Sequence, residues 1–165
     1  MTTISPGTDT VGAQSGVRVD AYRRFMQSFI DGDLESAVRF AADDAEIIEP
    51  CSLPWGGIYH GVDGFRNLCL NIGSQFAESR LVVDHLIEFG SDGLIVIAQL
   101  KGIAKGRRAE VSEYYHEVIY FRGPDPTRFT FARVNFNDDV RLIRAFGHDT
   151  FPDLTTPVPF PPRGN

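Results

Sequence analysis

The sequence predicts an α+β fold in which helices come first and then pack on one face of a mainly antiparallel sheet. Two observations support this prediction. Apolar residues recur at helical spacing through the first half of the chain, and apolar and polar residues alternate through much of the second half. The chain has 165 residues, of which 42% are hydrophobic, and this suits one domain with a sizeable core.

Three helices are predicted in the first half. The first has an apolar face at positions i, i+3, i+4 and i+7, formed by Tyr22, Phe25, Met26 and Phe29. It is expected to end at Gly32, which suits a left-handed C-terminal stop, and Asp33 can cap the second helix. The third helix is expected from about residue 62 to residue 76.

The second half is predicted to form the sheet. Alternation indicates strands at residues 81–89, 94–104 and 110–121, and an added strand at 129–136. A last strand is expected at Val140–Phe146. The domain is predicted to span residues 17–150. Residues 1–16, which are small and polar, and residues 151–165, which are rich in proline, are predicted to be tails.

Composition and charge exclude several classes of function. The net charge is -6, and no Lys or Arg cluster could follow a phosphate backbone, so no nucleic-acid partner is expected. No apolar run approaches the roughly 18 residues of a membrane span. Cys51 and Cys69 lack motif spacing and no secretory signal is seen, so reduced thiols in a cytoplasmic protein are expected. The four histidines are scattered, which gives no support to a metal site.

One short segment places a carboxylate among apolar residues. Glu49 follows Ile47 and Ile48 and precedes Pro50, and a Trp-Gly-Gly turn begins at Trp55. We interpret Glu49 as a candidate general base, because an apolar environment raises the pKa of a carboxyl towards neutral pH. The alternative is a structural carboxylate that caps a turn or pairs with an arginine.

Two segments resemble a known superfamily. They are DGDLESAVRFAADDAEIIEP at residues 31–50 and GGIYHGVDGFRNL at residues 56–68. With their Gly-Asp-Leu turn, acidic residue before proline and G-x-Y-x-G before a helix, they resemble the nuclear transport factor 2 superfamily, which includes ketosteroid isomerases and SnoaL-like polyketide cyclases. The resemblance covers residues 17–122 and 140–149. It implies a cone: a curved sheet wrapped around N-terminal helices and enclosing a deep apolar pocket.

The resemblance also implies roles for single residues. Ketosteroid isomerases use an aspartate base, and a tyrosine and a protonated aspartate form their oxyanion hole. By this resemblance the base falls on Glu49, while the tyrosine falls on Phe25, which has no hydroxyl. The protonated acid falls near Glu117, or on Ala132 if the segment 129–136 pairs with the last strand.

Three further candidates have two interpretations each, and two neighbouring residues are alternatives to each other. Trp55 and Tyr59 are either packing aromatics or the mouth of the pocket, where Tyr59 would donate to a substrate oxygen. His85 lies on the apolar side of its predicted strand and is either a core residue or a second acid–base group. His116 and Glu117 alternate on one strand, so only one of them can face the pocket.

These observations predict an enzyme without cofactor that transfers a proton next to a carbonyl, as an isomerase, cyclase or dehydratase. Glu49 would take the proton, and Tyr59 or His85 would polarise or reprotonate the ligand. The apolar wall would suit a small polyketide- or steroid-like molecule, and the lining would comprise Phe25, Met26, Phe29 and Trp55, with Asp149 at the mouth.

Two other functions remain open: a binding module without catalysis, and epoxide opening by two carboxylates around a water. No Gly-rich phosphate loop is present, so no nucleotide cofactor is expected. The open face of a curved sheet leaves apolar surface uncovered, which predicts a homodimer.

Overall fold

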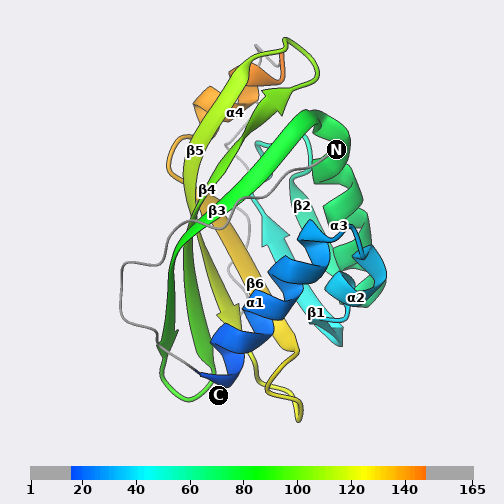
Figure 1. The fold of residues 1–165 in the computed structure, drawn as a ribbon, viewed down its shortest axis with the longest axis vertical. Helices are drawn as coiled ribbons and strands as arrows, with labels where there is room; N and C mark the ends of the chain where they lie inside the picture. Colours follow the sequence, from blue (N-terminus) through cyan, green and yellow to red (C-terminus); the bar gives the residue numbers. More distant parts are fainter. Residues whose placement is uncertain (1–15, 148–165) are drawn as a thin grey trace.

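The computed structural model describes residues 16–147, which form the α+β fold that the sequence predicts (Figure 1). In chain order the elements are α1 (Val17–Ile30), α2 (Leu34–Val38), β1 (Ala41–Glu49), β2 (Gly57–His60), α3 (Gly61–Gln75), β3 (Phe76–Phe89), β4 (Gly93–Ala104), β5 (Glu110–Tyr120), β6 (Phe129–Phe136) and α4 (Asp139–Ala145). The predicted tails, 1–16 and 151–165, lie outside the described residues except for Gly16.

The strands form one six-stranded sheet in the order β2-β1-β6-β5-β4-β3. Only the β1–β6 pair is parallel, and the other neighbours run antiparallel. The sheet is open and curves around α1 and α3, so that α1, α2 and α3 all pack on its inner face (Figure 1). This curvature creates an interior large enough to hold a cavity.

Local signals set the ends of the first two helices. Gly32 has a φ of +77°, and the side chain of Asp33 accepts a hydrogen bond from the Ser36 amide at 3.0 Å, so both residues act as the sequence predicts. The N-terminus of α1 is capped from a distance. Glu88 on β3 accepts from the backbone amides of Arg18 and Val19 at 3.0 and 3.2 Å, and this ties α1 to the sheet.

The predicted strand at Val140–Phe146 is wrong, because this segment forms helix α4. Asp138 is its N-cap and accepts from the Arg141 amide at 2.9 Å. Leu142, Ile143 and Phe146 are buried, and their spacing suits one face of a helix. The segment 129–136, expected only as an added strand, is β6 and lies between β1 and β5 in the sheet.

A bulge in β3 changes which residues face the core. Val83 pairs with Ala98 and His85 pairs with Ile97, so Asp84 is an extra residue in the ladder. Before the bulge, Val83 points inward, and after it Leu86 does, and both pack against the core. Strict alternation along residues 81–89 therefore fails at Asp84.

Aromatic rings fill much of the interior. At the α1 end Phe25 stacks on Phe40, with ring centroids 5.1 Å apart and planes within 13°. At the α4 end the ring of Phe146 meets Trp55 at 5.4 Å, nearly edge to face. These two clusters enclose the middle of the cone, where the candidate site lies.

Candidate functional site

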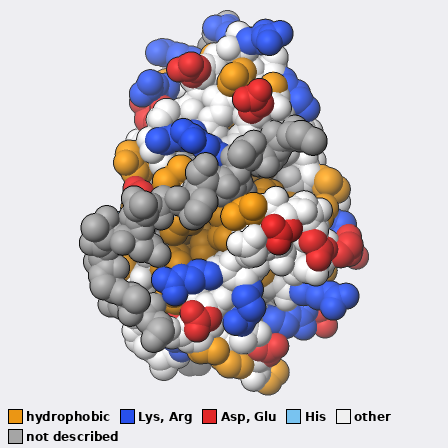
Figure 2. All heavy atoms as spheres, viewed as in Figure 1, with side chains coloured by type: hydrophobic (Ala, Val, Ile, Leu, Met, Phe, Trp, Pro, Cys, Tyr) orange, Lys and Arg blue, Asp and Glu red, His pale blue; other side chains and the backbone are white. Residues whose placement is uncertain are grey.

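The cone contains a cavity of about 120 Å³ that is lined mainly by apolar and aromatic side chains. Its lining residues are Tyr22, Phe25, Phe29, Phe40, Ile47, Glu49, Trp55, Phe65, Leu68, Cys69, Ile72, Gly73, Ser79, Arg80, Leu81, Leu100, Tyr115, Glu117, Val134 and Phe136. The exposed members, Gly73 on α3 and Arg80 on β3, mark its opening. Figure 2 shows apolar side chains at the surface between α1 and β3.

Glu49 is the last residue of β1, lies only 3% exposed, and lines this cavity. The turn after Pro50 brings Trp55 back over the strand end, and its Nε1 donates to Glu49 Oε2 at 3.2 Å. Burial and, to a smaller extent, the charge of Glu117 raise the pKa of Glu49 to about 8, although the hydrogen bond from Trp55 acts in the opposite direction. The pKa of Glu49 is therefore near neutrality, as its apolar sequence context predicts.

Glu117 lines the same cavity from β5. Val134 on the neighbouring strand β6 pairs with Glu117. The residue before it, Arg133, pairs with Ile48 of β1, and these two strands run parallel. Glu49, the residue after Ile48, therefore lies opposite Val134, on the same line across the sheet as Glu117. The two carboxyl-bearing residues are thus two strand spacings apart, roughly 10 Å between their Cα atoms. Burial raises the pKa of Glu117 to about 7.

Two tyrosines complete the polar part of the cavity. The hydroxyls of Tyr22 on α1 and Tyr115 on β5 are hydrogen bonded to each other. Burial is the main cause that raises the pKa of both, and the nearby charge of Glu117 raises them further. Both phenols therefore stay protonated at neutral pH. After their mutual bond, one hydroxyl proton of the pair remains available to a ligand oxygen.

Several sequence candidates do line the cavity. Phe25, Phe29 and Trp55 belong to its wall. Met26 is buried in the core but does not line the cavity, which corrects its prediction as a wall residue. Asp149 lies outside the described residues.

The proposed role of Tyr59 as a donor to substrate is wrong. Its hydroxyl donates to the backbone carbonyl of Trp55 at 2.6 Å, and it does not line the cavity. Asn71 Nδ2 contacts the same hydroxyl at 3.4 Å. The geometry shows a structural role in which Tyr59 holds the turn that carries Trp55.

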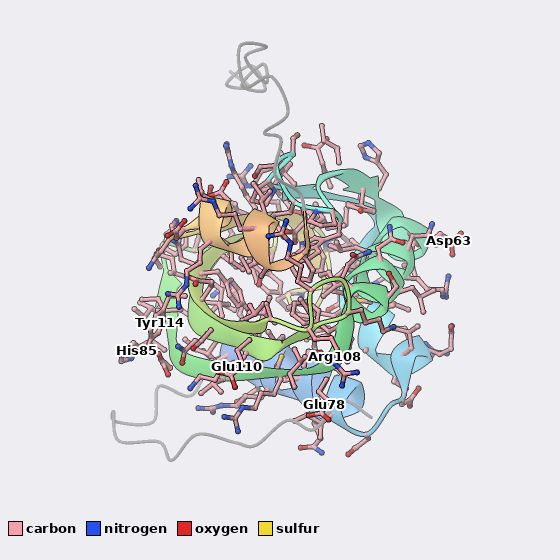
Figure 3. The ribbon with its side chains drawn as sticks, turned by 90° about the horizontal axis from the view of Figure 1, so that it is seen from above. Asp63, Glu78, His85, Arg108, Glu110 and Tyr114 are labelled. Carbon is pink, nitrogen blue, oxygen red and sulfur yellow. The ribbon has the colours of Figure 1, made fainter. Side chains whose placement is uncertain are left out.

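His85 does not lie on the apolar side of its strand, so its prediction as a core or catalytic residue is wrong. The bulge at Asp84 turns it to the exposed outer face, and Figure 3 shows it at the outside of the sheet, on the same side as Tyr114. The alternation on β5 places His116 on that outer face and Glu117 in the cavity. Ala132, the alternative to Glu117, is buried in β6 and carries no polar group.

Sequence reasoning missed Tyr22, Tyr115 and Cys69 as lining residues. Helical periodicity could have found Tyr22, because it lies one turn before Phe25 on the same face. Tyr115 lies two residues from Glu117 on the same face of β5 and follows once Glu117 is known to point inward. Cys69 is a buried, free thiol whose pKa burial raises to about 12, and Cys51 is exposed and free.

Within residues 16–147, no group of His, Cys, Asp and Glu side chains could hold a metal ion. None of the helices in this range is long and apolar enough to cross a membrane.

Comparisons with known proteins point to one fold. No model of a known protein family matches the sequence, and no curated protein matches it. An NTF2-like protein of unknown function from Burkholderia pseudomallei has a TM-score of 0.71 at 21% identity, over 81% of this chain and 99% of that chain. TerC, crystallised with polyporic acid, has a TM-score of 0.68 at 18% identity, over 79% of this chain and 98% of that one.

A protein from Shewanella denitrificans, described as a SnoaL-like polyketide cyclase, has a TM-score of 0.63 at 10% identity, over 79% of this chain and 97% of that chain. At these identities the likeness concerns the arrangement of the elements and not the chemistry. The chain therefore has the nuclear transport factor 2-like fold, as the resemblance of its sequence to that superfamily predicts.

Proposed function

We propose that the protein is an enzyme without cofactor that transfers a proton at a carbon next to a carbonyl in a small apolar molecule. An isomerase, a cyclase and a dehydratase all share this step. The observation that carries the proposal is the pair Glu49 and Glu117, two carboxyls with raised pKa values in one apolar cavity. A cavity that only holds an uncharged ligand needs no such pair, since burial of two acids is costly.

The pair can supply an acid and a base at the same pH. Glu117 ionises with a pKa of about 7 and Glu49 with a pKa of about 8, so between these values the two carboxyls hold a single proton. A proton shared in this way belongs to the pair rather than to either residue. In the arrangement of the pair in which Glu117 holds the shared proton, Glu49 is the base, with its ionised form stabilised by the N–H of Trp55, and Glu117 is the acid.

Ketosteroid isomerases have an oxyanion-hole tyrosine where this chain has Phe25, and Tyr22 and Tyr115 can supply the hydroxyl that Phe25 lacks. Tyr22 lies one helical turn before Phe25, and its bond to Tyr115 leaves one phenol proton to donate to a carbonyl oxygen. Donors placed where negative charge develops stabilise the transition state of enolisation. The cavity, at about 120 Å³, is close to the ~150 Å³ that holds one benzene molecule, so one ring fits its interior and a four-ring steroid does not.

Hydrogen–deuterium exchange tests this proposal. Cyclohexanone and cyclohexenone are incubated with the protein in deuterated buffer, and the loss of the protons next to the carbonyl is followed by NMR. We expect exchange above the buffer rate, with a bell-shaped pH profile whose limbs lie near 7 and 8. Exchange at the buffer rate for the whole ketone panel would overturn the proposal.

A second candidate function is supported by the same two carboxyls. Epoxide opening needs one acid to protonate the epoxide oxygen and one carboxylate to activate a water, and a pair that holds one proton offers both. Incubation with cyclohexene oxide distinguishes the two functions. Diol formation that requires both Glu49 and Glu117, without ketone exchange, would favour epoxide opening.

A further inference from the structure

The cavity contains two carboxyls and no cationic side chain in its interior. Glu49 is 3% exposed, its Oε2 accepts from Trp55, and the described residues provide no hydrogen bond to its Oε1. Within residues 16–147, no ion pair involves Glu49 or Glu117, and the only charge that acts on Glu49 is that of Glu117. Residues 16–147 therefore do not balance the charge of the cavity.

Elsewhere in the described residues, two carboxyls that are buried or half-buried pair with arginines. Glu113, which is also buried on the inner face of β5, lies 3.0 Å from Arg141 Nε. Glu88 lies 3.0 Å from Arg18 Nη1. The absence of such a partner is thus particular to the cavity, where a ligand can take the place of the arginine.

The wall of the cavity suits a positive charge for a second, independent reason. It presents the rings of Tyr22, Phe25, Phe40 and Phe65. Aromatic faces attract organic cations by their quadrupole, most strongly where water is excluded. A wall of rings next to unpaired carboxyls combines the two elements of ammonium recognition.

The other titratable groups around the cavity do not supply a countercharge. Tyr22 on α1, Cys69 on α3 and Tyr115 on β5 have raised pKa values and stay neutral. Arg80 on β3 is exposed at the opening, where solvent and salt screen its charge. The interior therefore becomes negative as soon as the carboxyl pair loses its first proton.

We propose that this cavity binds a small organic cation of about one ring in size, with its ammonium group between the carboxyls of Glu49 and Glu117 and its alkyl groups against the aromatic wall. This inference concerns the same cavity as the proposed function, but it rests on charge and geometry and holds whether or not the protein catalyses proton transfer. A monocation and a pair that holds one proton together have no net charge. When both carboxyls are protonated, binding of a monocation therefore requires the pair to lose a single proton.

Choline and its neutral analogue dimethylbutanol test this inference. The isomer used has a tert-butyl group in place of the trimethylammonium group, so the two molecules have the same shape and only choline is charged. Trp55, the only tryptophan of the chain, lines the cavity and serves as a fluorescent reporter, and calorimetry in two buffers counts the protons released. We expect choline to bind at least about tenfold more tightly than dimethylbutanol at pH 8. Its affinity should rise by about tenfold per pH unit well below 7 and flatten above, as binding coupled to loss of one proton requires.

A double substitution, Glu49→Gln with Glu117→Gln, isolates the role of charge. It should abolish the preference for choline and its pH dependence while dimethylbutanol binds within about twofold of the parent, which also shows that the cavity is intact. Glu113→Gln is the matched control, since it removes a buried carboxyl of the same strand outside the cavity and should leave choline binding unchanged.

Equal affinity of the parent for choline and dimethylbutanol at pH 8 would overturn the inference, as would choline binding that survives the double substitution. The proposed catalysis is judged separately. Ketone exchange without choline binding would reject the cation site alone, and choline binding without exchange or diol formation would reject the catalytic proposal alone.

Discussion

Two neighbouring rows of residues cross the sheet on opposite faces, and they differ in what they carry. The inner row runs Glu49, Val134, Glu117, Val96 and Leu86 over strands β1, β6, β5, β4 and β3. The outer row runs Ile58, Ile48, Arg133, Val118, Ile95 and Ile87 over strands β2, β1, β6, β5, β4 and β3. The inner row places two acids among apolar side chains under the helices, and the outer row places aliphatic side chains at the surface.

Both rows thus depart from the usual distribution of residues, because acids lie on the buried face and aliphatic side chains lie on the solvent face. On the outer row Ile58 is 51% exposed and Ile87 is 40% exposed, and no helix of the described residues covers this face (Figure 1). A buried acid without a cation costs stability, and a row of exposed aliphatic side chains leaves apolar surface in contact with water. We infer that each row serves an interaction with a second molecule: a small ligand on the inside and another protein surface on the outside.

The largest expected effect is a loss of ketone exchange when an acid of the inner row is replaced. Glu49→Gln keeps size and hydrogen-bonding capacity and removes the base, so the rate of ketone exchange should fall by about 10²–10⁴-fold. Glu117→Gln should also lower the rate, because it removes the acid of the pair. The measurement is the exchange rate by NMR, with ligand binding followed by Trp55 fluorescence.

Three variants serve as controls for this prediction. Glu113→Gln lies on the inner face outside the cavity, and His85→Ala and His116→Ala lie on the outer face. Each should retain the parent rate within about twofold, since none contacts the ligand space. If Glu49→Gln also stays within about twofold, Glu49 is not the base and the binding-module function becomes the better account.

The next effect concerns stability and pH. The pKa values of Glu49 and Glu117 rise from an ordinary value of 4.5 to about 8 and about 7 in the folded protein, so the folded state binds more protons than the unfolded state between about 4.5 and 8. The free energy of unfolding should therefore fall as pH rises through this window. Each pKa unit corresponds to about 1.4 kcal/mol, so the two carboxyls together account for a fall of up to about 8 kcal/mol.

Denaturant unfolding of Glu49→Gln beside the parent measures this effect. The variant should gain little below about pH 4.5 and become more stable than the parent by up to about 5 kcal/mol near pH 9. Glu110→Gln removes an exposed carboxyl on the outer side of β5 and should leave the pH dependence of the stability the same as in the parent. A parent whose stability is flat from pH 5 to pH 9 would show that the carboxyls are solvated or paired with a cation.

A smaller effect is expected on the outer row. We propose that two copies associate through this face as a homodimer, in which each residue of the row occurs twice across a two-fold axis. Ile87→Asp places two charges in the contact and should raise the dimer dissociation constant by at least about tenfold, with no change in ketone exchange. Light scattering at micromolar concentration gives the mass. A monomer mass for the parent would show that the outer row is not a dimer contact.

The contrast between the rows also shows what the sequence could and could not predict. The helical period located α1 and α3, and the apolar context of Glu49 indicated its burial without any knowledge of the fold. His85 was assigned to the wrong face because one extra residue, Asp84, shifts the alternation, and a bulge has no clear signal in a single sequence. A two-residue period is informative only as far as the next irregularity.

The cavity itself depends on contacts between residues that are distant in the chain. Glu49 and Glu117 lie in one row only because β6 enters the sheet between β1 and β5, and the segment after β6 forms α4 instead of the expected strand. The pairing of Tyr22 with Tyr115 joins a helix to a strand more than ninety residues later. Sequence patterns describe each element alone, so the acid pair could be suspected but its geometry could not be derived.

The smallest effect tests how far the functional part of the inner face extends. Tyr59 lies on the edge strand β2, where its hydroxyl donates to the Trp55 carbonyl at 2.6 Å and does not reach the cavity. Tyr59→Phe removes this bond and the longer one from Asn71 Nδ2, which should lower the free energy of unfolding by about 0.5–1.5 kcal/mol. The ring stays in place, so the turn that presents Trp55 to Glu49 should keep its position. The rate of ketone exchange should therefore change by less than about threefold. A rate loss above about tenfold, at unchanged stability, would mean that the Tyr59 hydroxyl acts on the ligand after all, and the site would then extend across the inner face to β2.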